Sequence, residues 1–336
     1  MGQKNNQRTA KRGFRFWLIR IGLGILILLI APFPIGTIWQ VIAQQSEREI
    51  LPLGQLVDVN GHKMHIYCTG EGSPTVILEG GVPEWSIHWQ KVQPKISKFT
   101  RVCSYDRAGY GWSEAGPSPR TAEKIVSELH TLLQNSGEAG PYVYVAHSFW
   151  GPAALLYQNI YPDEIVGMML IETWSPQLFS PAPDVIMQSI PLANTLNKLA
   201  PLGQIRLWGE LGVLPVESIF QTQLIPTELQ PAYKAAYYDG KLWNAMSEEY
   251  SAMNESGVQT QNLASLGDLP LVVIKAGIHP ADDYPPADVW DATQTSLAQL
   301  SSRGQLIIAE NSGHFVQLEQ PALVADMIQQ VIEEVK

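Results

Sequence analysis

Two residues of the chain, Ser148 and His314, stand in sequence contexts that could support nucleophilic catalysis. An apolar run at residues 142–146 passes directly into AHSFWG at 146–151 and then into a helical pattern. A serine on such a tight strand-to-helix turn stands clear of the backbone, and the N-terminus of the next helix favours developing negative charge beside it. Far along the chain, NSGHF at 311–315 places His314 in a loop. A serine hydroxyl needs a base of this kind to accept its proton, so the pair predicts acyl transfer, although a serine that merely caps the helix is the alternative.

The segments around these two residues alternate between strand and helix patterns. Such alternation predicts an α/β fold with a mostly parallel sheet, which binds ligands outside the carboxyl ends of its strands. The alternation stops over residues 176–265, which are rich in Pro, Leu and Trp, so this region reads as an insertion on the strand-end side. Strands are predicted at 56–59, 63–67, 75–78, 101–105, 142–146, 166–171, 271–275 and 305–308, and helices at 121–134, 152–161, 288–302 and 321–335.

The N-terminal region has the composition of a membrane anchor. The first 46 residues contain six cations and no acid, and the 19 residues from 21 to 39 carry no charge. As a helix they would reach about 28 Å, close to the roughly 30 Å hydrocarbon thickness of a bilayer. The cations predict a cytoplasmic segment at 1–20, a single-pass anchor at 21–43, a linker at 44–54 and a body on the extracytoplasmic side. Cleavage as a signal peptide near Ala43, followed by secretion of the body, is the alternative.

The charge balance excludes one class of partner. The chain has a formal net charge of −10, and beyond the first 46 residues 16 cations stand against 32 acids. A body this acidic would repel phosphates, so we expect no nucleic acid partner. The sequence contains no glycine-rich phosphate loop, no His/Cys metal cluster and no cofactor fingerprint, so we expect chemistry without a cofactor.

Three motifs resemble those of the α/β-hydrolase family. YDRAGYGWS at 105–113 resembles the family's YDRxGxGxS loop nearly residue for residue, and LEGGV at 78–82 resembles the loop after its third strand. The turn at 146–151 resembles its Gly-x-Ser-x-Gly nucleophile elbow. The resemblance implies an eight-stranded, mostly parallel sheet flanked by helices, built from residues 55–175 and 266–336, with the insertion at 176–265 as a helical cap.

The resemblance also implies roles for individual residues. Ser148 would be the nucleophile and His314 the general base, in the family's chain order. Backbone N–H groups of Phe149 and of Val82, or of Gly81 if the alignment slips by one, would hold the oxyanion. Each such donor contributes about 3–4 kcal/mol to transition-state stabilisation.

The acid of the triad is left open by the sequence. The family commonly places an aspartate soon after the strand at 271–275, but here that position reads as Pro280 and the acids come later. Some family members carry the acid at the end of the strand that corresponds to 166–171. Glu172 occupies that place and is our first choice, ahead of Asp282 and then Asp283.

The elbow departs from the family pattern at two positions. Ala146 replaces the first glycine with another small residue, whereas Trp150 replaces the second with the largest side chain. A small residue normally lets the following helix pack closely at this strained turn. Trp150 therefore motivates an alternative in which the domain binds a ligand or partner without catalysis.

The resemblance also gives a reading of the two cysteines. In this family the second strand is antiparallel and lies beside the fourth, which would bring Cys68 near Cys103. In an exported body the pair would form a disulfide, with two buried free thiols as the alternative.

The leading hypothesis is hydrolysis of a small, apolar carboxylic ester, with an aminopeptidase or amidase of the same fold as the nearest alternative. Epoxide and haloalkane hydrolases of this fold use a carboxylate nucleophile, which Ser148 is not. Aromatic residues of the insertion could line an acyl or alcohol pocket, or could form the core of the cap. These residues are Trp174, Phe179, Trp208, Tyr233, Tyr237, Tyr238 and Trp243.

Overall fold

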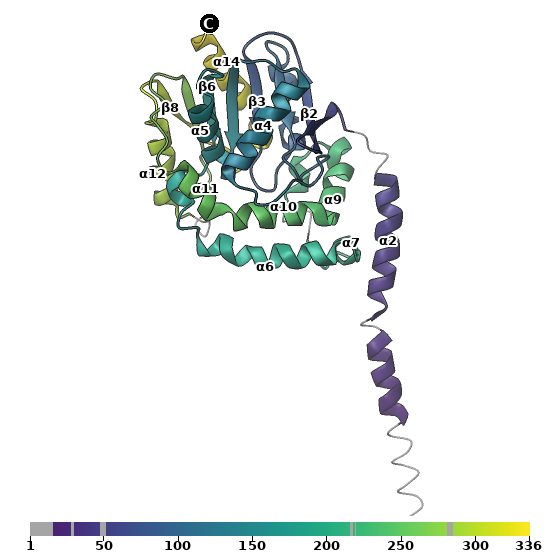
Figure 1. Cartoon of the computed structure of the whole chain (residues 1–336). Helices are drawn as coiled ribbons and strands as arrows, with labels where there is room; N and C mark the ends of the chain where they lie inside the picture. Colours follow the sequence, from purple (N-terminus) through teal and green to yellow (C-terminus); the bar gives the residue numbers. More distant parts are fainter. Residues whose placement is uncertain (1–15, 28–29, 48–51, 216–217, 219, 281–284) are drawn as a thin grey trace, which may run out of the picture.

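An eight-stranded sheet runs through the body of the molecule, with strand order β1-β2-β4-β3-β5-β6-β7-β8 (Figure 1). β1–β2 and β2–β4 pair antiparallel and the other neighbours pair parallel, which confirms the predicted fold class. The computed structural model describes residues 16–27, 30–47, 52–215, 218, 220–280 and 285–336. The strands are β1 (Gln55–Val59), β2 (His62–Thr69), β3 (Thr75–Glu79), β4 (Val102–Tyr105), β5 (Tyr142–His147), β6 (Ile165–Ile171), β7 (Leu271–Ala276) and β8 (Gly304–Ala309).

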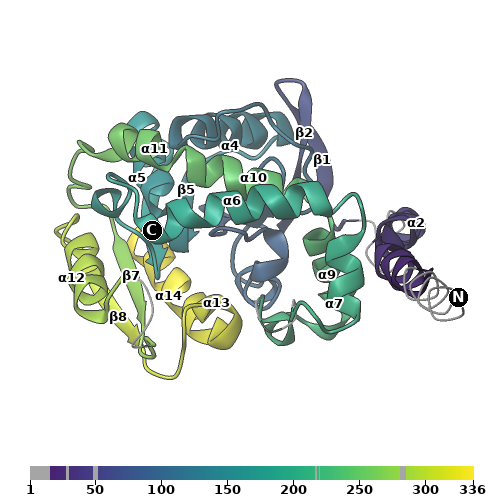
Figure 2. The same ribbon diagram turned by 90° about the horizontal axis from the view of Figure 1, so that it is seen from below.

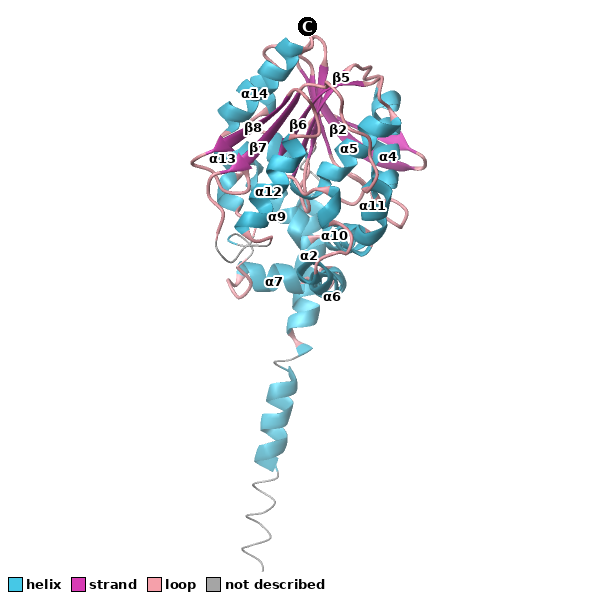
Figure 3. Ribbon diagram, turned by 90° about the vertical axis from the view of Figure 1, so that its left-hand side faces the viewer, coloured by secondary structure: helices cyan, strands magenta, loops and turns pink. Residues whose placement is uncertain are grey.

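Helices cover both faces of this sheet (Figure 3). Their apolar stripes meet the sheet's apolar faces, as the helical spacing of Ile125, Leu129 and Leu132 predicts for α4. Thr121 caps the start of α4 through the N–H of Lys124 at 3.3 Å, and Gly137 (φ 78°) ends it in the left-handed conformation. One face carries α4 (Ala122–Ser136), α5 (Gly151–Ile160) and α12 (Ala287–Ala298), and the other carries α3 (Gln93–Ile96), α13 (Val316–Glu319) and α14 (Pro321–Glu334).

The chain between β6 and β7 forms a layer of helices below the carboxyl ends of the strands (Figure 1). Tyr233, Tyr237 and Trp243 are buried there together with Ile205 and Leu242, so most of the aromatic residues of this layer form its own core. The helices are α6 (Asp184–Leu199), α7 (Gln204–Glu210), α9 (Gln230–Tyr238), α10 (Gly240–Ser251) and α11 (Met253–Thr260).

The N-terminal helical region leaves the body and extends well beyond it (Figure 1). Within Phe16–Glu47 it is long and apolar enough to cross a membrane. Its second part, α2 (Pro32–Glu47), lies against α7 and α9.

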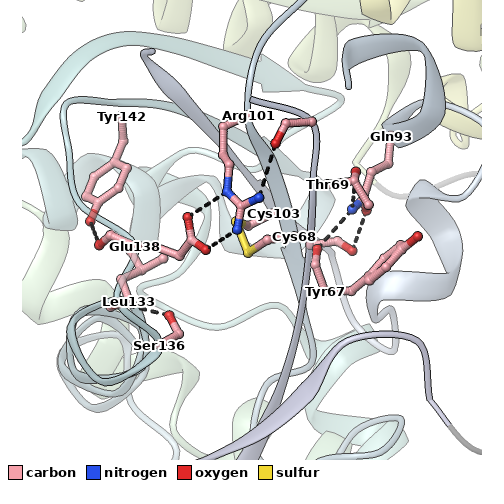
Figure 4. The surroundings of a disulfide bond; sticks show 12 residues. Tyr67, Cys68, Thr69, Gln93, Arg101, Cys103, Leu133, Ser136, Glu138 and Tyr142 are labelled. Carbon is pink, nitrogen blue, oxygen red and sulfur yellow. Dashed lines mark hydrogen bonds and ion pairs between the residues drawn. A yellow bond between two sulfur atoms is a disulfide. The ribbon is translucent and has the colours of Figure 1, made fainter. Parts of the chain in front are cut away.

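A disulfide joins Cys68 of β2 to Cys103 of β4, at directly opposed positions of the antiparallel pair (Figure 4). Arg101 and Glu138 form an ion pair of 2.5 Å next to it. The atoms of Cys68, Cys103 and Glu138 that could ligate a metal ion lie within 4.8 Å of one another. Because both sulfur atoms are bonded to each other, this group does not offer the thiolates that a metal site would need.

Candidate active site

Ser148 lies at the sharp turn where β5 ends and α5 begins. Its backbone φ of 57° is in the left-handed region, which non-glycine residues rarely adopt. Strain of this kind persists where the surroundings hold the chain, and here the Ser148 carbonyl accepts the N–H of Trp174 at 3.0 Å. Gly151 permits the close packing of the new helix, because a Cβ at this position would lie 2.6 Å from the Cβ of Thr173. The small residue that the turn requires is therefore supplied one position later than in the family pattern.

Side chains from the ends of three strands meet at Ser148. Glu172 follows β6, and His314 lies in the loop between β8 and α13. His314 Nε2 is 2.8 Å from Ser148 Oγ, and His314 Nδ1 is 3.3 Å from Glu172 Oε2. This is the order of hydroxyl, imidazole and carboxylate that general-base activation of a serine needs.

The surroundings of Glu172 keep it ionised. Its carboxylate accepts the N–H of Ala276 at 2.7 Å and the indole N–H of Trp290 at 3.1 Å. Burial on its own would raise the pKa of Glu172, but His314, Ala276 and Trp290 together outweigh burial and hold that pKa below its usual value. A carboxylate in this state holds the proton of its histidine partner on Nδ1, which leaves Nε2 free to face the serine. Trp290 was missed in the sequence, because a helical pattern does not show where its indole N–H points.

The other two acids considered for the triad, Asp282 and Asp283, lie outside the described residues. Among the three acids left open by the sequence, Glu172 is thus the one that the described structure brings to His314.

The loop after β3 lies against the serine. A Cβ on Gly81 would be 2.6 Å from the Cβ of Ser148, so only glycine fits there. The Gly81 N–H donates to Glu84 Oε2 at 2.9 Å. Val82 and Phe149 both line the cavity beside Ser148. Of the two alternatives for the second oxyanion donor, this arrangement favours Val82, because the N–H of Gly81 is already bound.

A buried guanidinium group fixes the orientation of this loop. Arg107 donates to the carbonyl oxygen of Gly80 at 2.5 Å and to that of Gly81 at 2.7 Å. In a trans peptide the carbonyl and the following N–H point in opposite directions. The N–H of Val82 is therefore directed away from Arg107.

The sequence raised the possibility that Trp150 fills the space needed at the turn. In the structure it does not. Its side chain is buried and its indole N–H donates to Glu249 Oε2 of α10 at 3.0 Å. Glu249 also accepts from Arg107 Nε at 2.9 Å and from the hydroxyl of Tyr110 at 2.9 Å. The large side chain thus connects the start of α5 to the helical layer below it, and it leaves Ser148 beside His314.

A second buried ion pair supports the loop that carries His314. His147 Nδ1 is 2.7 Å from Glu84 Oε1, and His147 Nε2 is 2.8 Å from the carbonyl oxygen of His314. Both ring nitrogens face acceptors, so both carry protons and the ring is cationic. Burial alone would lower the pKa of His147, but the neighbouring Glu84 carboxylate outweighs burial and raises it. Burial alone would raise the pKa of Glu84, but the His147 cation outweighs burial and lowers it to about 2. No local pattern in the sequence indicates that Glu84 would meet His147.

The cavity over Ser148 has a volume of about 320 Å³ and is lined by both aromatic and polar side chains. It is of a size for a small ligand with an apolar group. A larger cavity of about 420 Å³ lies between α2 and α9, but the triad residues do not line it. Besides Ser148, Glu172 and His314, the smaller cavity is lined by the aromatic residues Phe149, Trp174, Tyr250, Trp290 and Phe315, and by Val82, Ile186, Gln221, Ile278, His279, Pro280 and Pro285.

Replacing Glu84 by Gln should destabilise the protein in a pH-dependent way. The lowered pKa of Glu84 contributes stability above its ordinary value of 4.5, and this is lost as the pH falls toward about 2. The raised pKa of His147 contributes stability below its ordinary value of 6.5, and this is lost as the pH rises through the folded-state pKa. We expect the loss in Glu84→Gln to be greatest between these two values, at about 3 kcal/mol. Urea unfolding of the full chain in detergent from pH 4 to pH 9 measures it, with the exposed Glu123→Gln as control; a loss that is constant with pH would contradict the ion pair.

Comparison with known proteins identifies the family of the chain. A family model described as the alpha/beta hydrolase family matches residues 79–327. YbdG of Bacillus subtilis is 26% identical over 226 residues, which cover 66% of this chain and 68% of the relative. A Schizosaccharomyces pombe relative is 26% identical over 299 residues, although the chain spans only 53% of its length. A soluble epoxide hydrolase of Corynebacterium sp. is 25% identical over 289 residues, which cover 80% of this chain and 93% of that enzyme.

Solved structures show the same fold. An esterase from Thermogutta terrifontis superposes with a TM-score of 0.64 at 20% identity, covering 84% of this chain and 99% of the esterase. An epoxide hydrolase from Vigna radiata gives a TM-score of 0.64 at 20% identity, covering 83% of this chain and 97% of that enzyme. Since the family model matches most of the chain and the sheet has the expected order, the chain belongs to the α/β-hydrolase family.

Proposed function

We propose that the protein is a serine hydrolase that cleaves a carboxylic ester through an acyl-enzyme. The observation that carries this proposal is the 2.8 Å separation of His314 Nε2 from Ser148 Oγ, with Glu172 on the far side of the imidazole. The residue type at the nucleophile position also supports ester hydrolysis over the epoxide hydrolysis of some relatives. Ser148 can form an acyl-enzyme, whereas epoxide and haloalkane hydrolysis on this fold uses a carboxylate nucleophile.

In the first step, Ser148 Oγ attacks the ester carbonyl carbon while its proton passes to His314 Nε2. The N–H groups of Phe149 and Val82 stabilise the oxyanion, and Glu172 stabilises the imidazolium. Collapse of the intermediate breaks the carbon–oxygen bond of the ester, and His314 returns the proton to the leaving alcohol. Water then attacks the acyl-enzyme by the same route, so that the acid leaves and Ser148 regains its proton.

The aromatic side chains in the lining of the 320 Å³ cavity support an apolar acyl or alcohol group in the substrate. Residues 176–265 would act as the cap over this cavity. A purely ligand-binding role was motivated by Trp150, but this residue lies in the Glu249 network and not between Ser148 and His314. Catalysis is therefore the function that we propose.

Ser148 should react with a fluorophosphonate probe. We expect the full chain in detergent to incorporate one probe per molecule, because His314 can activate the hydroxyl, and we expect Ser148→Ala to incorporate none. In-gel fluorescence and mass spectrometry of the labelled peptide measure this, with Ser136→Ala as a remote serine control. A folded wild-type protein that fails to label, or a Ser148→Ala variant that still labels, would refute the nucleophile.

Glu172→Gln should lower kcat for an activated ester by about 10³–10⁴-fold, because the neutral amide leaves the imidazole in the wrong tautomer. Asp282→Asn serves as the matched control and should change kcat by less than about threefold, because His314 Nδ1 already has Glu172 as its partner. Steady-state kinetics of both variants on p-nitrophenyl butyrate decide the assignment. Full activity in Glu172→Gln together with a large loss in Asp282→Asn would move the acid to Asp282.

The proposal includes a single-pass anchor, with residues 1–20 in the cytoplasm and the body on the extracytoplasmic side. The cations before the apolar helix support this orientation. An uncleaved anchor is favoured over cleavage near Ala43, because cleavage would remove Gly36 and Gln40, two residues of α2 that are buried against the body.

On this placement, Cys68 and Cys103 should be linked in protein taken directly from cells. An extracytoplasmic compartment is oxidising, so the disulfide should form and persist there. Non-reducing peptide mapping after alkylation of free thiols tests this expectation. Recovery of both cysteines as alkylated thiols would contradict export of the body.

A further inference from the structure

The apolar helix is not joined to the body by a loose tether, since α2 is bound to the helical layer by a buried polar interface. Arg206 of α7 is only 6% exposed, and its Nε donates to Gln40 Oε1 at 2.7 Å. Gln40 is 1% exposed and donates in turn to the carbonyl oxygen of Tyr238 at 2.9 Å. Arg206 also forms an ion pair of 2.7 Å with Glu47. A buried cation of this kind holds its partners in one arrangement, because separating them would leave the charge unpaired.

Backbone contact fixes the height of α2 on the body. A Cβ on Gly203 would lie 1.9 Å from the carbonyl oxygen of Gly36, so the two glycines allow the chains to touch. Gly203 also has a φ of 67°, which favours glycine. Gln204 donates to the carbonyl oxygen of Pro32 at 3.0 Å. The N-terminal end of α7 is therefore held at the level of residues 32–36 of the anchor.

This level lies near the extracytoplasmic edge of a bilayer around the apolar helix. Residues 21–36, which follow the cytoplasmic segment, would extend about 24 Å as a helix, most of the roughly 30 Å thickness of the hydrocarbon core. Ile38 and Ile42 lie on the side of α2 away from the body and are 62% and 64% exposed. The apolar surface of the anchor thus continues upward alongside α7, and the layer at this height would meet the headgroup zone.

The helices at this edge of the body expose several apolar side chains and few charged ones. In Figure 1, α6 and α7 form the lower edge of the body and the N-terminal helix continues below them; Figure 2 shows α6 lying across that face. Over residues 184–214 the exposed charged side chains are Asp184, Lys198 and Glu210. We call the following exposed residues the cap face: Val185, Met187, Leu192, Leu202, Leu211 and Val213.

A residue next to the cap face in the chain lines the cavity of the candidate active site. Ile186 lies in α6 between two residues of the cap face, and it lines the cavity that holds Ser148 and His314. Ile278, which is 56% exposed, lines the same cavity from the loop after β7. An ester that enters beside α6 would therefore come from the side of the molecule on which the anchor lies.

We propose that the cap face rests on the lipid bilayer from which the anchor emerges, and that the active site takes esters dissolved in that bilayer. The proposal rests on the serine hydrolase and the uncleaved anchor proposed above. It deepens them by naming the substrate class: an ester with a long acyl chain or a similarly apolar alcohol. The polar interface between α2 and α7 is the part of the chain that holds the cap face at the membrane.

Contact with lipid can be measured without any activity. We use the full chain in phosphatidylcholine vesicles, with a bimane fluorophore on Val213→Cys of the cap face or on Ile308→Cys of β8. Ile308 is 47% exposed, and it lies on a strand of the central sheet. Lipids with a nitroxide in the headgroup should quench the label at position 213 at least threefold more than the label at 308. Equal quenching at both positions would overturn the contact.

Substrate choice is tested in the same vesicles. Replacing Leu211 and Val213 together by Asp should lower the hydrolysis of bilayer-dissolved p-nitrophenyl palmitate about tenfold and leave that of water-soluble p-nitrophenyl acetate unchanged. A double variant with Ile160→Asp and Ile308→Asp serves as control and should leave both rates unchanged. An equal effect of the cap-face variant on both esters, or no effect on either, would overturn the proposal.

The failure of each part has its own signature. If the wild type hydrolyses neither ester but quenching at position 213 is found, the serine hydrolase proposal fails and the membrane contact stands. If the chain does not sediment with vesicles, the anchor proposal fails. If hydrolysis and sedimentation are found but quenching is equal at both positions, the inference about the cap face fails on its own.

Discussion

Much of this structure depends on where one buried positive charge is placed. Arg107 lies between Glu79 at the end of β3 and Glu249 of α10, at 2.7 and 2.9 Å. Removing a guanidinium from water costs several kcal/mol, and this cost is offset only when partners surround it. Glu79 is fully buried, and this burial raises its pKa to about 7 even beside the cation. The loop after β3, the loop after β4 and the helical layer must therefore meet in one arrangement.

The same cation prepares the catalytic geometry that we propose. By binding the carbonyl oxygens of Gly80 and Gly81, it sets the peptide whose N–H would receive the oxyanion. Two residues of the proposed triad have strained backbone conformations, with φ of 57° at Ser148 and 50° at Glu172. Such strain needs a rigid surrounding structure, and the two buried ion pairs, Arg107 with its acids and His147 with Glu84, supply it.

A second buried cation holds the N-terminal helix at the other end of the helical layer. Arg206 is a second buried guanidinium, and its partners Gln40 and Glu47 belong to α2. The Arg107 network thus couples the helical layer to the loop after β3. The Arg206 network couples the same layer to α2 of the apolar N-terminal helix. Under the proposals made above, the helical layer would contact both the lipid and the ester.

The sequence was sufficient for the features that local patterns encode. Each predicted strand end lies within two residues of the observed one, because apolar runs and turn residues mark the strands directly. Ser148 and His314 were selected by their own short motifs, and the structure brings them together. The apolar N-terminal helix and the acidic body follow from composition alone.

Other features were decided only by tertiary structure, because they depend on which distant groups meet in a buried space. Glu172 and His314 are 142 residues apart in the chain, and no pattern near either one distinguishes Glu172 from Asp282 as the partner. From the sequence, Trp150 was considered as a residue that could obstruct the turn at Ser148, but in the structure its indole N–H donates to Glu249 of α10. The binding of α2 to the body arises in the same way, since burial and hydrogen bonding between remote segments are properties of the folded chain and not of any local run of residues.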